Sequence, residues 1–291
     1  MGMSVNTNVG AMAALQALNS TSKGLASIQS RINSGMSVQS TKDDSASFSI
    51  AQNLRGDLGG LKAVTSSLSR AKSVTDVAVA GAEQISDVVN QMKTLAKQAS
   101  DEGISADSRS AYNKDFKALR DQINTIVDSS SFNGTNLLKA SGGSVTALQS
   151  LGSSASSGSY TPDALTVANQ GLGLAASETA STGPGTGVLG KTSEIDTAAK
   201  AQKMVDTLDT LSSSLNGKLS DLGSASRKID AQMEFTSKLS DTIESGIGNL
   251  VDADLAKESA KLQALQVKQQ LGVQALSIAN QAPATITSLF R

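Results

Sequence analysis

Two apolar stripes run along the last forty residues of the chain, 252–291. Both follow the three- and four-residue spacing of an α-helix. The first stripe holds Leu255, Leu262, Leu265, Gly272, Leu276 and Ala279, and the second holds Val267, Leu271, Ile278 and Ala282. Gln and Ser, rather than charged residues, separate the two stripes. Because a surface helix needs only one apolar stripe, this pattern predicts a helix that is covered on both sides.

The other end of the chain, residues 1–41, has the same character and carries two charged side chains, Lys23 and Arg31. Its apolar residues at helical spacing are Met12, Leu15, Leu18, Leu25, Ile28 and Ile32. We expect the two ends to pair through the first stripe and then to assemble with copies through the second. The expected polymerisation residues are Leu15, Leu18, Leu25, Ile28, Ile32, Leu262, Leu265, Val267, Leu271, Leu276 and Ile278. A buried helical pair within one large domain is the alternative.

Two long helical patterns lie between these ends. The first runs to about residue 100 on a seam of alternating four- and three-residue steps, and Thr41 with Asp44 resembles its N-cap. The second runs from about residue 192 to 251. A turn region separates them, so we expect the two helices to be antiparallel, with Leu250 near Ile50.

Between the long helices, a third helix is predicted from about residue 105, with the stripe Tyr112, Phe116, Leu119, Ile123 and Ile126. Asn133–Gly134 predicts a tight turn. Residues 140–190 are rich in Gly, Ser and Thr, and residues 145–151 and 164–174 are candidate strands within exposed loop. Residues 145–187 are expected to add little to the packing of the long helices.

The predicted fold is therefore mainly α: a long antiparallel coiled-coil-like helix bundle built from both ends of the chain, with a small β/loop region in the middle. Three parts are expected. Residues 1–41 and 252–291 form paired terminal helices, residues 42–139 and 191–251 form a domain of long antiparallel helices, and residues 140–190 form a variable surface segment.

The amino-acid composition limits which catalytic and metal sites the chain can form. The chain has no Cys and no His, which removes thiol nucleophiles, Ser-His-Asp triads and the usual zinc sites. The adjacent carboxylates Asp43–Asp44 and Asp101–Glu102 are expected to cap helices and turns rather than to catalyse. The net charge of −1 gives no overall field that attracts nucleic acid, and no apolar run is long enough to span a bilayer. We expect no enzyme activity, cofactor or metal, and no cleaved signal peptide.

Three segments together resemble bacterial flagellin: NTNVGAMAALQALNSTSKGLASIQSRINSGMSVQSTKDDSASFSIAQNLR at 6–55, SSSFNGTNLL at 129–138 and ESGIGNLVDADLAKESAKLQALQVKQQLGVQALSIANQAPATITSLFR at 244–291. The resemblance implies a secreted subunit of the helical motility filament, whose terminal helices form an inner tube inside a shell of long helices. It also implies export by the flagellar type III apparatus without cleavage, a chaperone on the C-terminal strip, and cap and junction proteins as partners.

Two alternatives share parts of this pattern. A hook–filament junction protein is similar to flagellin at both ends, although such proteins usually match the terminal motif less fully. A signalling coiled coil of the chemoreceptor type also builds long Ala/Ser-rich hairpins. Its hairpin tip is a tight turn, however, whereas about fifty Gly/Ser-rich residues stand at that place here.

The resemblance also implies a receptor contact on the first long helix. Flagellins detected by their Toll-like receptor carry a motif of the form QRVRELAVQ, which aligns with residues 90–98. Leu95 and Ala96 match, but Gln91 replaces the Arg of the second position and Thr94 replaces the Glu; Lys93 is a further position of the motif. We therefore expect weak or absent activation of that receptor, because charged hot-spot contacts are missing.

Overall fold

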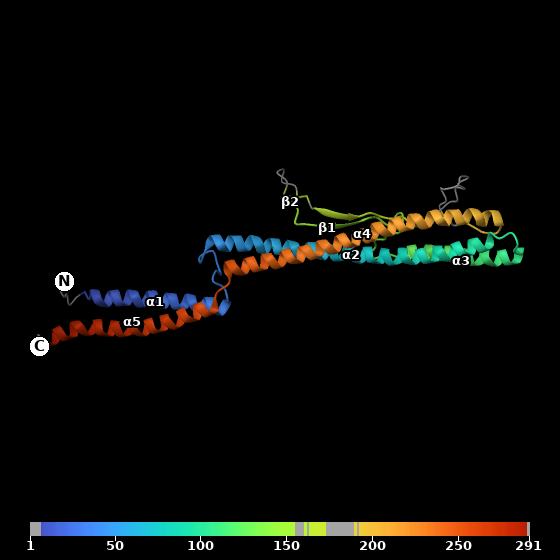
Figure 1. Cartoon of the computed structure of the whole chain (residues 1–291). Coiled ribbons are helices and arrows are strands. Elements are labelled where there is room, and N and C mark those ends of the chain that lie inside the picture. Colours follow the sequence, from blue (N-terminus) through green and yellow to red (C-terminus); the bar gives the residue numbers. More distant parts are fainter. Residues whose placement is uncertain (1–6, 155–159, 162, 173–188, 191, 290–291) are drawn as a thin grey trace. The chain divides into compact units, whose positions relative to one another are not determined.

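The computed structural model describes residues 7–154, 160–161, 163–172, 189–190 and 192–289, and the side chains of 7–152, 163–172, 189–190 and 192–281 (Figure 1). Helices dominate that part of the chain, so the predicted fold class is confirmed. The helices are α1 (Val9–Ser34), α2 (Ser45–Ala99), α3 (Ala106–Ser129), α4 (Ala198–Val251) and α5 (Leu255–Leu289). The strands are β1 (Val145–Leu148), β2 (Ser153–Ser154), β3 (Tyr160–Thr161) and β4 (Ala164–Val167).

The chain folds into two compact units. Unit 1 comprises Met1–Leu58 and Asp241–Arg291, and unit 2 comprises Gly59–Ser240. The helices α2 and α4 therefore contribute residues to both units. The division into terminal, long-helix and surface parts that the sequence suggests concerns the layers of an assembly, and it stays a prediction.

A polar side chain directly before each helix accepts hydrogen bonds from that helix's first free N–H groups. These capping residues are Asn8, Asp44, Ser105, Thr197 and Asp254. At α2 the cap is Asp44 itself, so assigning the cap to Thr41 was wrong. The Asp44 carboxylate accepts from the amides of Ala46 and Ser47, at 3.0 and 3.2 Å, and from the Ser47 hydroxyl. The Ser47 hydrogen bonds hold the pKa of Asp44 below its usual value.

In unit 2, α2 and α4 are antiparallel, as predicted. Lys72 pairs with Asp230 at 2.6 Å, and Lys93 pairs with Asp209. Lys93 follows Lys72 by 21 residues on α2, and its partner Asp209 precedes Asp230 by 21 residues on α4, so the two helices run in opposite directions. The seam of α4 repeats every seventh residue through Ala201, Leu208, Leu215, Leu222, Ile229 and Thr236, and all are at most 1% exposed. This is the heptad period of a coiled coil.

The facing seam of α2 matches the sequence prediction from Leu61 to Ala96. The buried positions are Leu61, Val64, Leu68, Ala71, Thr75, Ala78, Ala82, Ile85, Val89, Met92 and Ala96. Asn133 and Gly134 both have positive φ, 49° and 79°, between the bridged residues Phe132 and Thr135. The predicted tight turn after α3 is therefore confirmed.

The seam of unit 2 is covered by a third layer along both of its halves. Helix α3 covers one half through Phe116, Ile123 and Val127, all at most 2% exposed. Strands β1 and β4 pair antiparallel, with Val145 opposite Val167, and their inner residues join the same core. Both predicted strands are confirmed at 145–148 and 164–167, whereas the short β2–β3 pair was not predicted.

Residues 145–187 were expected to add little to the packing of the long helices, and this was wrong. Four of these residues lie in the core of unit 2 with at most 9% of their surface exposed: Val145, Ala147, Val167 and Leu172. The backbone is also tied to the helices, because Leu148 donates to the Ser67 hydroxyl at 3.1 Å and Gln232 donates to the Gln149 carbonyl at 2.7 Å. Two paired helices leave an open groove along their seam, and this hairpin fills half of it.

In unit 1, α1 and α5 lie side by side and antiparallel (Figure 1). The Asn8 side chain donates to the Ala279 carbonyl at 2.7 Å. A Cβ atom added to Gly272 would lie 3.3 Å from Leu18, and one added to Gly24 would lie 3.3 Å from Leu265. The two glycines therefore let the helices approach closely.

A small apolar cluster closes the other end of unit 1. Ala51, Ile247 and Val251 are buried there, and Leu250 packs against them. Leu250 thus lies close to the predicted place, but the seam passes through Ala51 and leaves Ile50 50% exposed. The amide of Ala253 donates to the Gly35 carbonyl at 2.8 Å and ties the start of α5 to the end of α1.

Candidate assembly surface

The first stripe of the C-terminal helix faces α1 from Leu262 onward, whereas Leu255, which the sequence also places on it, is 50% exposed. Leu262, Leu265 and Leu276 are half-buried, and so are Leu18, Leu25 and Ile32 on α1. Among the described side chains of α1 and α5, Ile28 and Glu258 alone are buried, at 8% and 5% exposure. The two terminal helices therefore share a thin contact and have no enclosed core of their own.

The second stripe of α5 points away from α1 and is uncovered. Val267, Leu271 and Ile278 are 55%, 58% and 66% exposed. We call these three residues the outer stripe, and Ala282, which the sequence places on it, lies outside the described side chains. Val273 is also exposed, although the sequence reasoning missed it because it lies two residues from Leu271 rather than three or four.

The free side of α1 is apolar as well. Val9, Met12 and Leu15 are 75%, 64% and 49% exposed. They share one face of α1 with the polar residues Gln16, Asn19 and Lys23. Exposed contiguous apolar surface of this kind marks an interaction site.

A second groove lies between α2 and α3 in unit 2. Its lining residues are Gln91, Thr94, Leu95, Gln98, Asp115, Ala118, Leu119 and Gln122, and its volume is about 600 Å³. Three of the four receptor-motif positions named from the sequence therefore meet at one groove. The fourth, Lys93, does not line this groove and forms an ion pair with Asp209 of α4.

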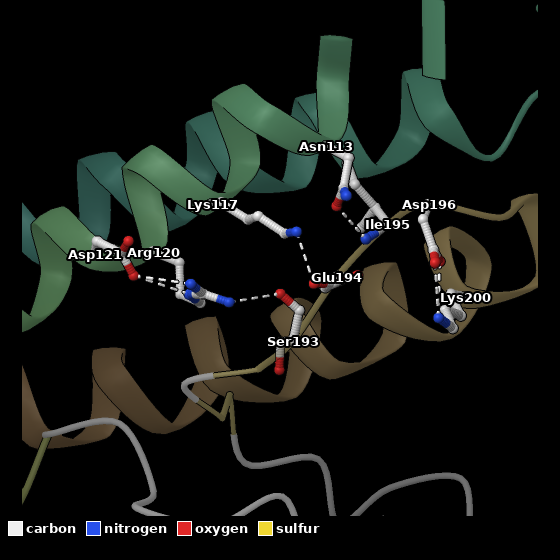
Figure 2. Close-up of polar contacts among 9 residues, drawn as sticks. All are labelled: Asn113, Lys117, Arg120, Asp121, Ser193, Glu194, Ile195, Asp196 and Lys200. Carbon is white, nitrogen blue, oxygen red and sulfur yellow. Dashed lines mark hydrogen bonds and ion pairs between the residues drawn. The ribbon is translucent and has the colours of Figure 1, made fainter. Parts of the chain in front are cut away.

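Three side chains of α3 hold the segment that leads into α4 (Figure 2). The Asn113 side-chain oxygen accepts from the Ile195 amide at 2.8 Å, and Arg120 donates to the Ser193 carbonyl at 3.1 Å. Lys117 pairs with Glu194 at 2.6 Å. Arg120 is only 8% exposed and also pairs with the exposed Asp121. These contacts fix where α4 begins.

Replacing Arg120 with Ala is expected to lower the free energy of unfolding of unit 2 by about 2–3 kcal/mol, because the buried Ser193 carbonyl loses its donor and a packed side chain is removed. Lys117→Ala is the matched control. It removes a partly exposed ion pair and is expected to cost less than about 1 kcal/mol. Urea unfolding followed by helical circular dichroism measures both variants, and equal small losses would contradict the assignment.

In the described part of the chain, no helix is long and apolar enough to cross a membrane. No group of three or more acidic side chains there is placed to hold a metal ion.

These features define a class: a helical structural subunit that pairs its own two ends and leaves an apolar stripe of α5 exposed. The chain belongs to the bacterial flagellin family. The model for the bacterial flagellin N-terminal helical region matches residues 5–142, and the model for the C-terminal helical region matches residues 205–290. The chain is a structural subunit of the flagellar filament, which lies outside the cell.

Curated relatives match nearly the whole chain. Flagellin FljK of Caulobacter vibrioides is 44% identical over 288 residues, which cover 99% of this chain and 98% of that protein. A flagellin of Brucella melitensis is 36% identical over 99% of both chains. A solved structure of a proposed flagellar hook-associated protein from Vibrio parahaemolyticus has a TM-score of 0.53 at 15% identity, covering 72% of this chain and 100% of that one. That last likeness shows the fold alone, and neither the junction-protein nor the signalling alternative is favoured.

Proposed function

We propose that the chain polymerises through the outer stripe of α5 and the free apolar side of α1, so that the terminal helices of many copies form an inner tube. The long helices of unit 2 would form the next shell, and residues 140–190 would lie towards the outside. One observation carries this proposal. The first-stripe residues Leu262, Leu265 and Leu276, which we call the inner stripe, are half-buried against α1, whereas Val267, Leu271 and Ile278 are more than half exposed.

The experiment that tests this proposal is seeded polymerisation of a chain with a charge on the outer stripe, Ile278→Asp. Apolar side chains this exposed on one face favour burial against another chain. A charge in the same place would oppose that burial at every subunit contact.

Before assembly, the outer stripe needs another cover. We propose that a cytosolic export chaperone binds the C-terminal strip, and that the flagellar type III apparatus exports the chain without cleavage. In the finished filament, cap and junction proteins would contact the terminal subunits. The support is chemical: an apolar stripe on a helix with few charges from Leu262 onward would otherwise promote aggregation in the cell.

Limited trypsin digestion of the free subunit is expected to trim residues 1 to about 40 and 255–291 while unit 2 survives. The terminal helices have almost no buried side chains, so they open far more readily than the heptad seam of unit 2. Mass spectrometry of the digest locates the cleavages at sites such as Lys23, Arg31 and Lys257. Ends that resist trypsin as long as unit 2 does would show that they are packed before assembly.

The free subunit is expected to activate the Toll-like receptor for flagellin weakly or not at all. Gln91 and Thr94 stand at the groove where the receptor motif has an Arg and a Glu, and the positive charge of Lys93 is engaged by Asp209. A reporter-cell assay measures this, with the double variant Gln91→Arg, Thr94→Glu as the gain-of-function control. Full potency of the unmodified subunit at nanomolar concentration would contradict the prediction.

A further inference from the structure

An exposed aromatic ring stands on α4 of unit 2. Phe235 is 59% exposed, one residue before Thr236, which is buried on the seam. A ring of this size buries about 150–250 Å² when it is covered. Phe132, which is 41% exposed, belongs to the turn after α3, whereas Phe235 stands on the side of a regular helix.

Unit 2 also carries a groove that no part of the described chain fills. The groove between α2 and α3 has the apolar side chains Leu95, Ala118 and Leu119, bordered by amides and by Asp115. Phe235 cannot reach it within the same chain. The antiparallel register places Phe235 beside residue 67 of α2, because Lys72 faces Asp230. Leu95 lies about 28 residues further along α2, or roughly 40 Å at 1.5 Å per residue.

A helical filament requires two different surface patches that fit each other, because a head-to-tail contact that does not close produces an open polymer. We propose that Phe235 of one subunit inserts into the α2–α3 groove of a neighbouring subunit. The occupant is thus a second copy of this chain. The inference rests on the chain's role as a filament subunit, but it does not depend on the outer stripe.

Charge and direction support this pairing. Lys228 lies two turns before Phe235 on the same side of α4, is exposed and has no ion pair among the described side chains. Asp115 lies one turn before Leu119 on α3 and is likewise exposed and unpaired. Both α3 and α4 run antiparallel to α2, since Arg109 contacts the Ala99 carbonyl and Lys72 contacts Asp230. In a neighbour of the same orientation, Lys228 therefore approaches Asp115 when Phe235 enters the groove.

The absence of cysteine from the chain allows a direct test. The variant Phe235→Cys, Leu119→Cys is grown from seeds of unmodified filament, at a subunit concentration high enough to offset the loss of the ring, and then oxidised. A disulfide needs its two Cα atoms within about 7 Å, so a bond inside one chain is excluded. We expect disulfide-linked dimers and a ladder of larger species in filaments, and none in free subunit at the same concentration. The control pair Lys203→Cys, Leu119→Cys should give none.

Filaments that form but contain no Phe235–Leu119 disulfide would overturn this inference. Phe235→Ala supplies a second measurement. It should raise the monomer concentration needed for elongation about tenfold or more, and unfolding of the free subunit should stay unchanged. A failure of the unmodified chain to polymerise would instead overturn the proposed function, so the two failures are distinguishable.

Discussion

Ile278→Asp is expected to stop seeded polymerisation while leaving the free subunit folded. Ile278 is 66% exposed in the single chain, so the new carboxylate is solvated there and costs almost nothing. In an assembly that covers the outer stripe, the same carboxylate is buried without a partner, at a cost of roughly several kcal/mol. The cost repeats at every subunit of the lattice. Pelletable polymer after seeding and thermal melting of the free subunit are the two measurements.

A matched control separates the outer stripe from surface charge in general. Lys203→Asp places a carboxylate on the exposed side of α4 in unit 2 and should assemble almost normally. Leu276→Asp provides a contrast on the inner stripe, where the side chain is already half-buried against α1, and it should weaken the helix pair itself. Normal filaments from Ile278→Asp would show that the outer stripe faces solvent in the polymer.

The sequence predicted the long helices well because their signal is repeated many times. Each seam continues over most of a helix with more than fifty residues, so one misplaced position changes little. Where the repeat weakens, at the start of α2, the seam was assigned to Ile50 instead of Ala51. The two stripes of α5 were separable for the same reason, since each contributes several residues at helical spacing.

The sequence could not reveal elements that are only a few residues long, or contacts between residues that lie far apart in the chain. Strand β1 has four residues, and an alternation of buried and exposed positions over four residues is a weak signal inside a Gly/Ser-rich segment. Arg120 looks like a surface charge on α3, and only the fold brings the Ser193 carbonyl to it. Likewise, nothing local links residues 90–98 with α3 as one groove.

The hairpin β1–β4 carries the second large expected effect. Ala147→Asp should lower the free energy of unfolding of unit 2 by about 3–5 kcal/mol, because Ala147 is 1% exposed and an ionised carboxylate there has no partner. For a unit of this size, that loss lowers the melting temperature by roughly 10 °C. Thr146→Asp is the matched control, since Thr146 is the next residue and lies on the exposed face of the same strand.

Deleting residues 145–187 extends the test to the whole hairpin. The deletion removes Val145, Ala147, Val167 and Leu172 from the core and uncovers the half of the α2–α4 seam that α3 does not reach. We expect the loss to exceed that of Ala147→Asp, because large-to-small core changes each cost about 2–5 kcal/mol and four buried side chains are lost together. Thermal melting of the free subunit measures it. If the deletion variant melts at the same temperature as the unmodified chain, α2 and α4 must pack against each other without needing the hairpin to cover their seam.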